Sequence, residues 1–359
     1  MGRYEQSLAL ASKALALIDE GQLPNDATDF GVEPFSSAPY LRVRLLVDVA
    51  RDQGQLGRPE EQERALRAAL VAAADIPFWS FLRPGWRALV QEELAEVLRE
   101  HGRTDEAVAL ALDALGTRRA IMRASVAVAL TYPDTTRNAR ELFLRSTTNA
   151  VETLLAAGQR AAATANLETG LALARGHGFR AHEGRLLAVL ARVRHESGAH
   201  AEAAALREQA LANERAVDPD GPRFVELYTD LGVVRRAQDR RDDAMAALRE
   251  AIRRHEDFRA AFTSARSRNA VFERRLRAYY LAALAAMDRG DQEAAFELAE
   301  RARARGFLDL LAHRASLARE GRPELLAEER ALRAAQMTAL REFGAPFFWA
   351  AYQLTGDGG

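Results

Sequence analysis

The sequence has no cysteine, and Lys13 is its only lysine among 359 residues. Without cysteine there can be no disulfide, no thiolate metal ligand and no cysteine nucleophile. The 50 basic residues are balanced by 51 acidic ones, which leaves a net charge of -1. Proteins that bind nucleic acids usually carry a basic excess that displaces counterions from phosphates. No nucleic-acid partner is therefore expected.

Long apolar runs are missing as well. No stretch approaches the roughly 20 apolar residues that a membrane-spanning helix needs. The first residues, Met1–Gln6, lack the apolar core of a signal peptide. We therefore expect a cytoplasmic protein without a membrane partner. With 48% hydrophobic residues, the chain has ample material for a folded core.

Strand signals are nearly absent, whereas helical periodicity is present along most of the chain. The clearest unit is 225–256, in which Leu231-Gly232 is followed by Ala244, Leu248 and Ala251. This pattern is typical of a tetratricopeptide repeat, where a small residue on the first helix faces small residues on the second. Two helices joined by a tight turn can approach closely only if their crossing point carries small side chains.

The same skeleton recurs along the chain, with a glycine at the turn between the two helices. The turn glycines are Gly57, Gly102, Gly158, Gly198 and Gly290, and Asp239 takes this place in the 225–256 unit. The alternative is a generic helical bundle with alanine-rich contacts, but the ordered recurrence favours a repeat array. We predict an all-α, tetratricopeptide-like α-solenoid of about six to seven antiparallel helix pairs with a C-terminal capping helix.

The segment from 257 to 312 is more distinctive. Its last helix carries four groups of residues: Ala295-Phe296, Ala299-Glu300, Arg303-Ala304-Arg305 and Leu308-Asp309-Leu310-Leu311. This segment resembles the last repeat of proteins in which tetratricopeptide repeats precede a caspase-like peptidase domain of the separase-related CHAT family. In that family a His and a Cys form the catalytic dyad, and this sequence has no Cys. The resemblance therefore implies the regulatory repeat region and not the peptidase.

We expect three regions: repeats over 1–256, the CHAT-associated repeat over 257–312, and a capping helix with an apolar tail over 313–359. The tail contains Phe347, Phe348, Trp349 and Tyr352. These side chains can pack back on the last helices as a cap, because the end of a solenoid must cover its apolar face. Alternatively they form a docking patch for a further domain or a partner.

No arrangement in the sequence indicates catalysis. The seven histidines show no His-x3-His spacing for a metal on one helical face. The carboxylates lie three or four residues from arginines, as in exposed helical ion pairs. No G-x-S-x-G pattern marks a nucleophile elbow. We expect no enzyme activity, no metal and no cofactor.

In tetratricopeptide arrays the first helix of each pair lines the concave surface. The inward positions fall thirteen, ten, six and three residues before the turn residue. Read onto this chain, they select Arg44, Arg51, Arg145, Glu152, Arg185, Arg192, Glu226, Arg236, Arg277 and Tyr280. Because a guanidinium fork binds carboxylates bidentately, an acidic or carboxylate-ended peptide would suit such a groove. The alternative is that these arginines are simply solvated helix faces.

Two functions fit these observations. The first is a non-catalytic protein-protein interaction scaffold that controls a CHAT-type caspase-like peptidase, in cis or in trans, by binding the peptidase or its regulator. The second is a free-standing sensor in which the repeat array binds a signalling peptide. Both functions require a protein or peptide partner, and neither requires a cofactor.

Overall fold

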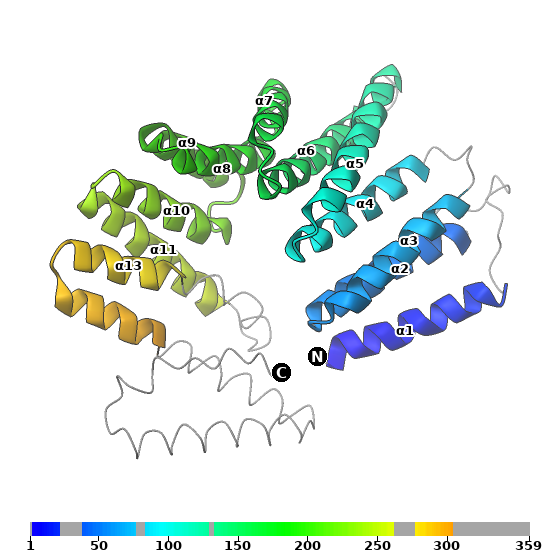
Figure 1. Cartoon of the computed structure of the whole chain (residues 1–359), viewed down its shortest axis with the longest axis horizontal. Coiled ribbons are helices and arrows are strands. Elements are labelled where there is room, and N and C mark those ends of the chain that lie inside the picture. Colours follow the sequence, from blue (N-terminus) through cyan, green and yellow to red (C-terminus); the bar gives the residue numbers. More distant parts are fainter. Residues whose placement is uncertain (1, 22–37, 77–82, 129–132, 262–276, 304–359) are drawn as a thin grey trace, which may run out of the picture. The chain divides into compact units, whose positions relative to one another are not determined.

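The computed structural model describes residues 2–21, 38–76, 83–128, 133–261 and 277–303, and every regular element in these ranges is helical (Figure 1). The α-helices are α1 (Gly2–Asp19), α2 (Ala38–Gln55), α3 (Pro59–Asp75), α4 (Arg83–Glu100), α5 (Thr104–Ser125), α6 (Pro133–Ala156), α7 (Arg160–Gly176), α8 (Arg180–Glu196), α9 (His200–Val217), α10 (Arg223–Ala237), α11 (Arg241–Ala261) and α13 (Arg277–Asp288). A short 3-10 helix, η2 (Val126–Val128), follows α5, and residues 292–303 are also helical.

Consecutive helices pack as antiparallel pairs. The described pairs are α2 with α3, α4 with α5, α6 with α7, α8 with α9, α10 with α11, and α13 with the helical residues 292–303, while α1 packs on α2. The prediction of an all-α, tetratricopeptide-like helical repeat fold is confirmed. The predicted capping helix and the tail residues Phe347, Phe348, Trp349 and Tyr352 lie outside the described residues.

The chain divides into two compact units, 1–221 and 222–359. The first unit contains α1 to α9, and the second contains α10, α11, α13 and the helical residues 292–303. Helix α11 runs across position 256, where the sequence suggested a boundary. The three-region organisation stays a prediction, since the boundary at 312 lies outside the described residues.

The small residues of the repeat motif lie where paired helices cross. In the first unit Leu94, Ala95, Ala107, Ala111 and Leu115 belong to one buried cluster. A corresponding cluster in the second unit contains Leu248, Ala251, Ala278, Ala282 and Ala295. Alanine at these positions lets the helix backbones approach, and the leucines fill the remaining space. The sequence motif therefore marks the core of the protein.

In the described part of the chain, seven turns between helices are closed in the same way. In each, a backbone amide bonds to the carbonyl five residues earlier, as from Arg103 to Leu98 at 2.8 Å and from Arg240 to Arg235 at 3.0 Å. This bond requires the preceding residue to adopt a left-handed conformation, which costs glycine little. Six turns have glycine there, with φ between 70° and 82°: Gly57, Gly102, Gly158, Gly178, Gly198 and Gly290. The seventh has Asp239, with φ of 57°.

Asp239→Gly is therefore expected to raise the free energy of unfolding of the second unit by about 0.5–1 kcal/mol. A left-handed L-residue costs about 1–2 kcal/mol, and part of the gain is lost to the greater freedom of glycine in the unfolded chain. The ion pair between Asp239 and Arg241, 2.7 Å long, is exposed and contributes little. Urea unfolding followed by circular dichroism measures the change. Asp239→Ala removes the same carboxylate without relieving the backbone, so equal stability of the two variants would contradict this explanation.

Candidate functional site

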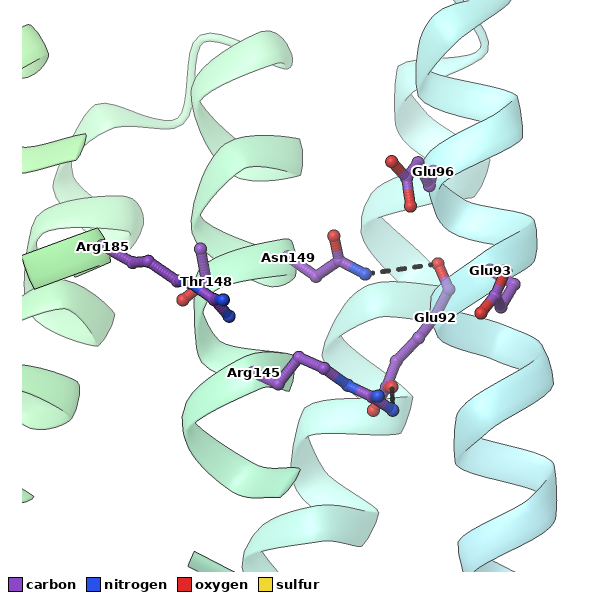
Figure 2. A pocket seen from close by; sticks show the side chains of 7 residues that line it. All are labelled: Glu92, Glu93, Glu96, Arg145, Thr148, Asn149 and Arg185. Atoms are coloured by element: carbon purple, nitrogen blue, oxygen red, sulfur yellow. Dashed lines mark hydrogen bonds and ion pairs between the residues drawn. The ribbon is translucent and has the colours of Figure 1, made fainter. Parts of the chain in front are cut away.

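In the first unit, the first helices of three successive pairs, α4, α6 and α8, pack next to one another. Their side chains line a pocket of about 200 Å³, here called the groove pocket (Figure 2). The lining residues are Glu92, Glu93 and Glu96 of α4, Arg145, Thr148 and Asn149 of α6, and Arg185 of α8. Residues three or four positions apart lie on the same face of a helix. The lining residues of α4 and those of α6 have this spacing, so each of these two helices presents them from one face.

Glu92 anchors the pocket. Its carboxylate and the guanidinium of Arg118, which reaches it from α5, are each only 5% exposed and are joined by a 2.9 Å hydrogen bond. The second carboxylate oxygen of Glu92 accepts a bond from Arg145 at 3.2 Å. The side-chain amide of Asn149 lies 3.5 Å from the Glu92 backbone carbonyl (Figure 2). The buried carboxylate therefore positions Arg145 of α6 at the pocket wall, while Asn149 of the same helix contacts the backbone of Glu92.

Further ion pairs connect neighbouring first helices. Arg51 of α2 donates to Glu93 at 2.7 Å, and Arg99 of α4 donates to Glu152 of α6 at 2.9 Å. Arg192 of α8 lies 3.7 Å from the other carboxylate oxygen of Glu152. The hydrogen bond to Glu93 raises the pKa of the Arg51 guanidinium. These contacts form a row of alternating charges, here called the ion-pair row, across α2, α4, α6 and α8.

Glu96 is the exception among these carboxylates. Its side chain is 50% exposed, and its one ion-pair contact among the described residues is with Arg99, at 3.9 Å. Burial of the carboxylate among the groove residues raises the pKa of Glu96. Arg99 opposes this effect, and the neighbouring charges of Glu100, Glu93 and Glu152 reinforce it. Glu96 is thus a carboxylate in a pocket with no close counter-ion.

The structure brings together five of the predicted groove residues. Arg145 and Arg185 line the groove pocket, and Arg51, Glu152 and Arg192 belong to the ion-pair row. The sixth in this unit, Arg44, is exposed on α2, outside both sets, and makes no ion pair among the described residues.

The other predicted groove residues lie in the second unit. Arg236 bonds to Asp288, which raises the pKa of the guanidinium, and Arg277 donates to Asp230 at 3.1 Å. Tyr280 is half exposed, and Glu226 is exposed on α10. That these residues share a groove with those of the first unit stays a prediction.

Two solved structures share this fold at low sequence identity. The crystal structure of BtubC (BKLC) from P. vanneervenii is 15% identical, covers 70% of this chain and 92% of its own, and has a TM-score of 0.56. The apo form of RapI is 12% identical, covers 94% of this chain and 80% of its own, and has a TM-score of 0.54. The likeness is one of fold alone. No protein-family model and no curated protein matches the sequence.

Sequence reasoning missed the acidic wall of the groove pocket. Applied to the turn at Gly102, the register that selected the arginines also selects Glu92, ten residues earlier, and Glu96, six residues earlier. The signal was therefore available in the sequence. Glu93 falls outside this register and could be found only from the structure, through its bond to Arg51.

The described ranges contain neither a metal site nor a membrane-spanning helix. No group of three or more His, Asp or Glu side chains there is arranged to hold a metal ion. No helix in those ranges is both long and apolar enough to cross a membrane. The groove pocket and the ion-pair row are the candidate functional site.

Proposed function

We propose that this chain is a non-catalytic binding module and that its groove pocket and ion-pair row hold a protein or peptide partner. The observation that carries this proposal is a polar pocket between the inward faces of three successive repeats. Donors and acceptors line it together: the guanidinium groups of Arg145 and Arg185, the amide of Asn149 and the carboxylate of Glu96. A peptide main chain and its polar side chains present the matching groups.

The chemistry of the pocket favours binding over catalysis. Its carboxylates and guanidinium groups can neutralise and orient a ligand, but nucleophilic catalysis needs a hydroxyl or thiol beside a base. The one hydroxyl that lines the pocket belongs to Thr148, and it donates to the Leu144 carbonyl at 3.1 Å. That bond ties the hydroxyl to its own helix instead of to a base.

The partner we propose is a CHAT-type caspase-like peptidase or its regulator, controlled in cis or in trans. This finer proposal is supported by the sequence resemblance over 257–312. Within that segment α13 and the helical residues 292–303 form one repeat pair. A CHAT-type peptidase encoded beside this chain should form a complex with it, detected by size-exclusion chromatography, and its cleavage rate should change. An unchanged rate without a complex would contradict the finer proposal.

The second candidate is a free-standing peptide sensor. The small volume of the groove pocket, about 200 Å³, favours it, because such a pocket takes one or two side chains of an extended peptide. A short peptide that raises the melting temperature of the chain without any protein partner would support the sensor.

Selection of a random 12-residue peptide library on the immobilised full chain tests the binding function itself. We expect a family of related sequences to be enriched. Arg185→Glu reverses a charge on the pocket wall and should weaken the selected peptides by at least about tenfold, the value of a charge-assisted hydrogen bond. Arg180→Glu reverses an exposed charge on the same helix outside the pocket and is the matched control. Failure to enrich any sequence, from a folded bait, would contradict the proposed function.

A further inference from the structure

We propose that the Glu96 end of the groove pocket receives the side chain of a lysine or arginine from the bound peptide. This inference rests on the proposed binding function and names the chemistry of its ligand. It also differs from the acidic ligand that the arginine-rich register suggested, because the structure shows how the charges of the groove are already matched.

The pocket has two ends of different charge. On the α4 wall, the Arg145 guanidinium lies against Glu92 at one end and Glu96 lies at the other, with Asn149 between them (Figure 2). Arg185 extends from α8 into the pocket, toward the place where Thr148 of α6 is drawn (Figure 2). A peptide in this pocket therefore meets guanidinium groups on one side and a carboxylate on the other.

The other carboxylates of the groove have close arginine partners. Arg118 donates to Glu92 at 2.9 Å, and Arg51 donates to Glu93 at 2.7 Å. Arg99 donates to Glu152 at 2.9 Å. Glu96 has only the 3.9 Å contact already described. This distance is too long for a hydrogen bond. Among the groove carboxylates in the described part of the chain, Glu96 therefore gains most from a cation supplied by a ligand.

Charges around Glu96 favour a cation. The groups that act on it are Glu93, Arg99 and Glu100 of its own helix and Glu152 of α6. From the other neighbouring helices, Arg51 of α2 and Arg118 of α5 are held by Glu93 and Glu92, and Arg192 of α8 lies against Glu152. Burial of the Glu96 carboxylate is the main cause of its raised pKa, and the charges of these three carboxylates outweigh in number the one guanidinium that acts on it.

An acidic ligand is expected to bind more weakly than a basic one over most of the groove. To reach Arg51 or Arg192 it would have to compete with carboxylates already in place, Glu93 and Glu152. A lysine ammonium or arginine guanidinium at Glu96 competes with no arginine hydrogen-bonded to that carboxylate in the described part of the chain, and it completes an ion pair with its own hydrogen bonds.

The test compares three full-length proteins, the wild type, Glu96→Gln and the control Glu100→Gln, on the same 12-residue peptide library. Glu100 lies one turn further along α4 and does not line the pocket. We expect the peptides selected by the wild type to share a lysine or arginine at one position. Isothermal titration calorimetry should show that Glu96→Gln weakens these peptides by about tenfold or more, whereas Glu100→Gln changes their affinity less than about threefold.

A second measurement separates a direct contact from a loss of fold. Replacing the shared basic residue of a selected peptide by norleucine keeps the aliphatic chain and removes the charge. The norleucine peptide should bind the wild type and Glu96→Gln with equal affinity, so that the two substitutions are not additive. If the norleucine peptide still distinguishes the two proteins by the full factor, the contact is not with Glu96 and the inference is overturned.

The affinity for a basic peptide should depend on pH in one direction. A basic peptide binds the ionised form of Glu96, and its affinity for the wild type should fall as the pH is lowered through the raised pKa of that group. Binding should also release protons, detected as a dependence of the calorimetric enthalpy on the buffer. Both effects should be smaller in Glu96→Gln.

The outcomes distinguish this inference from the proposed function. Selected peptides without a shared basic residue, or equal affinities for the wild type and Glu96→Gln, would overturn the inference and leave the binding function standing. Failure to select any peptide on a folded wild-type chain would count against both.

Discussion

Arg118→Met is expected to lower the free energy of unfolding of the first compact unit by about 3–5 kcal/mol, the usual effect of leaving one partner of a buried ion pair alone. Arg118 and Glu92 are both only 5% exposed. Methionine keeps much of the arginine stem and removes its charge and its donors. The Glu92 carboxylate would then keep only Arg145, at 3.2 Å, whose side chain is 48% exposed.

Urea unfolding of the full chain, followed by circular dichroism, measures this loss in the transition of the first unit. Arg87→Met is the matched control, because Arg87 pairs with Asp113 in the same pair of helices but both side chains are more than half exposed. Breaking such a pair should cost less than about 1 kcal/mol. The double variant Glu92→Leu with Arg118→Met should recover most of the loss, since no buried charge remains. If Arg118→Met cost no more than Arg87→Met, the pair would not be buried in solution.

The effect should extend to the groove. The Glu92 carboxylate holds Arg145, so an unpaired Glu92 that draws Arg145 inward would move this guanidinium away from the pocket wall. Peptides selected by the wild type should therefore bind Arg118→Met more weakly at a temperature where the variant is still folded. Unchanged affinity would show that the groove does not depend on this anchor.

Gly232→Ala and Gly116→Ala are expected to change stability in opposite directions. Gly232 lies at the crossing of α10 and α11, where an added Cβ would be 2.6 Å from Leu248 Cγ and 3.3 Å from the Ala244 carbonyl oxygen. Overpacking of this kind costs about 1–3 kcal/mol and outweighs the better helix propensity of alanine. We therefore expect a net loss of about 1–2 kcal/mol in the second unit.

Gly116 lies on the exposed side of α5, and a Cβ there would meet nothing within 4 Å. The same substitution should therefore stabilise the first unit by about 0.5–1 kcal/mol. Thermal unfolding of the two variants and the wild type measures whether Gly232→Ala lowers the stability and Gly116→Ala raises it. A stabilising Gly232→Ala would show that Leu248 moves aside freely, and that close approach of the helices does not explain the glycine.

The repeat architecture could be predicted because its signals are local. Apolar spacing along 225–256 predicts two helices, and Gly232 with Ala244 and Leu248 marks their crossing. The turn glycines, and Asp239 in their place, adopt the left-handed conformation that ends each first helix. These features depend on residues a few positions apart, so the order of residues specifies them without knowledge of the rest of the fold.

The charge matching of the groove could not be predicted in this way. Glu92 meets Arg118, 26 residues away, and Arg145, 53 residues away, and Arg51 meets Glu93 across 42 residues. A net charge of -1 shows that charges balance and says nothing about which ones pair. The register that selects Arg145 and Arg185 selects Arg44 equally, although the pocket includes only the first two.

The sequence by itself determined the helices, their turns, the small residues at their crossings and hence the all-α repeat fold. Only the tertiary structure decided which inward-facing charges neutralise one another, and that Glu96 of the groove pocket has no close arginine partner among the described residues. The reason is physical. Helices and turns form through backbone contacts between near neighbours, whereas the electrostatic state of a side chain depends on groups brought to it by helices that are distant in the chain.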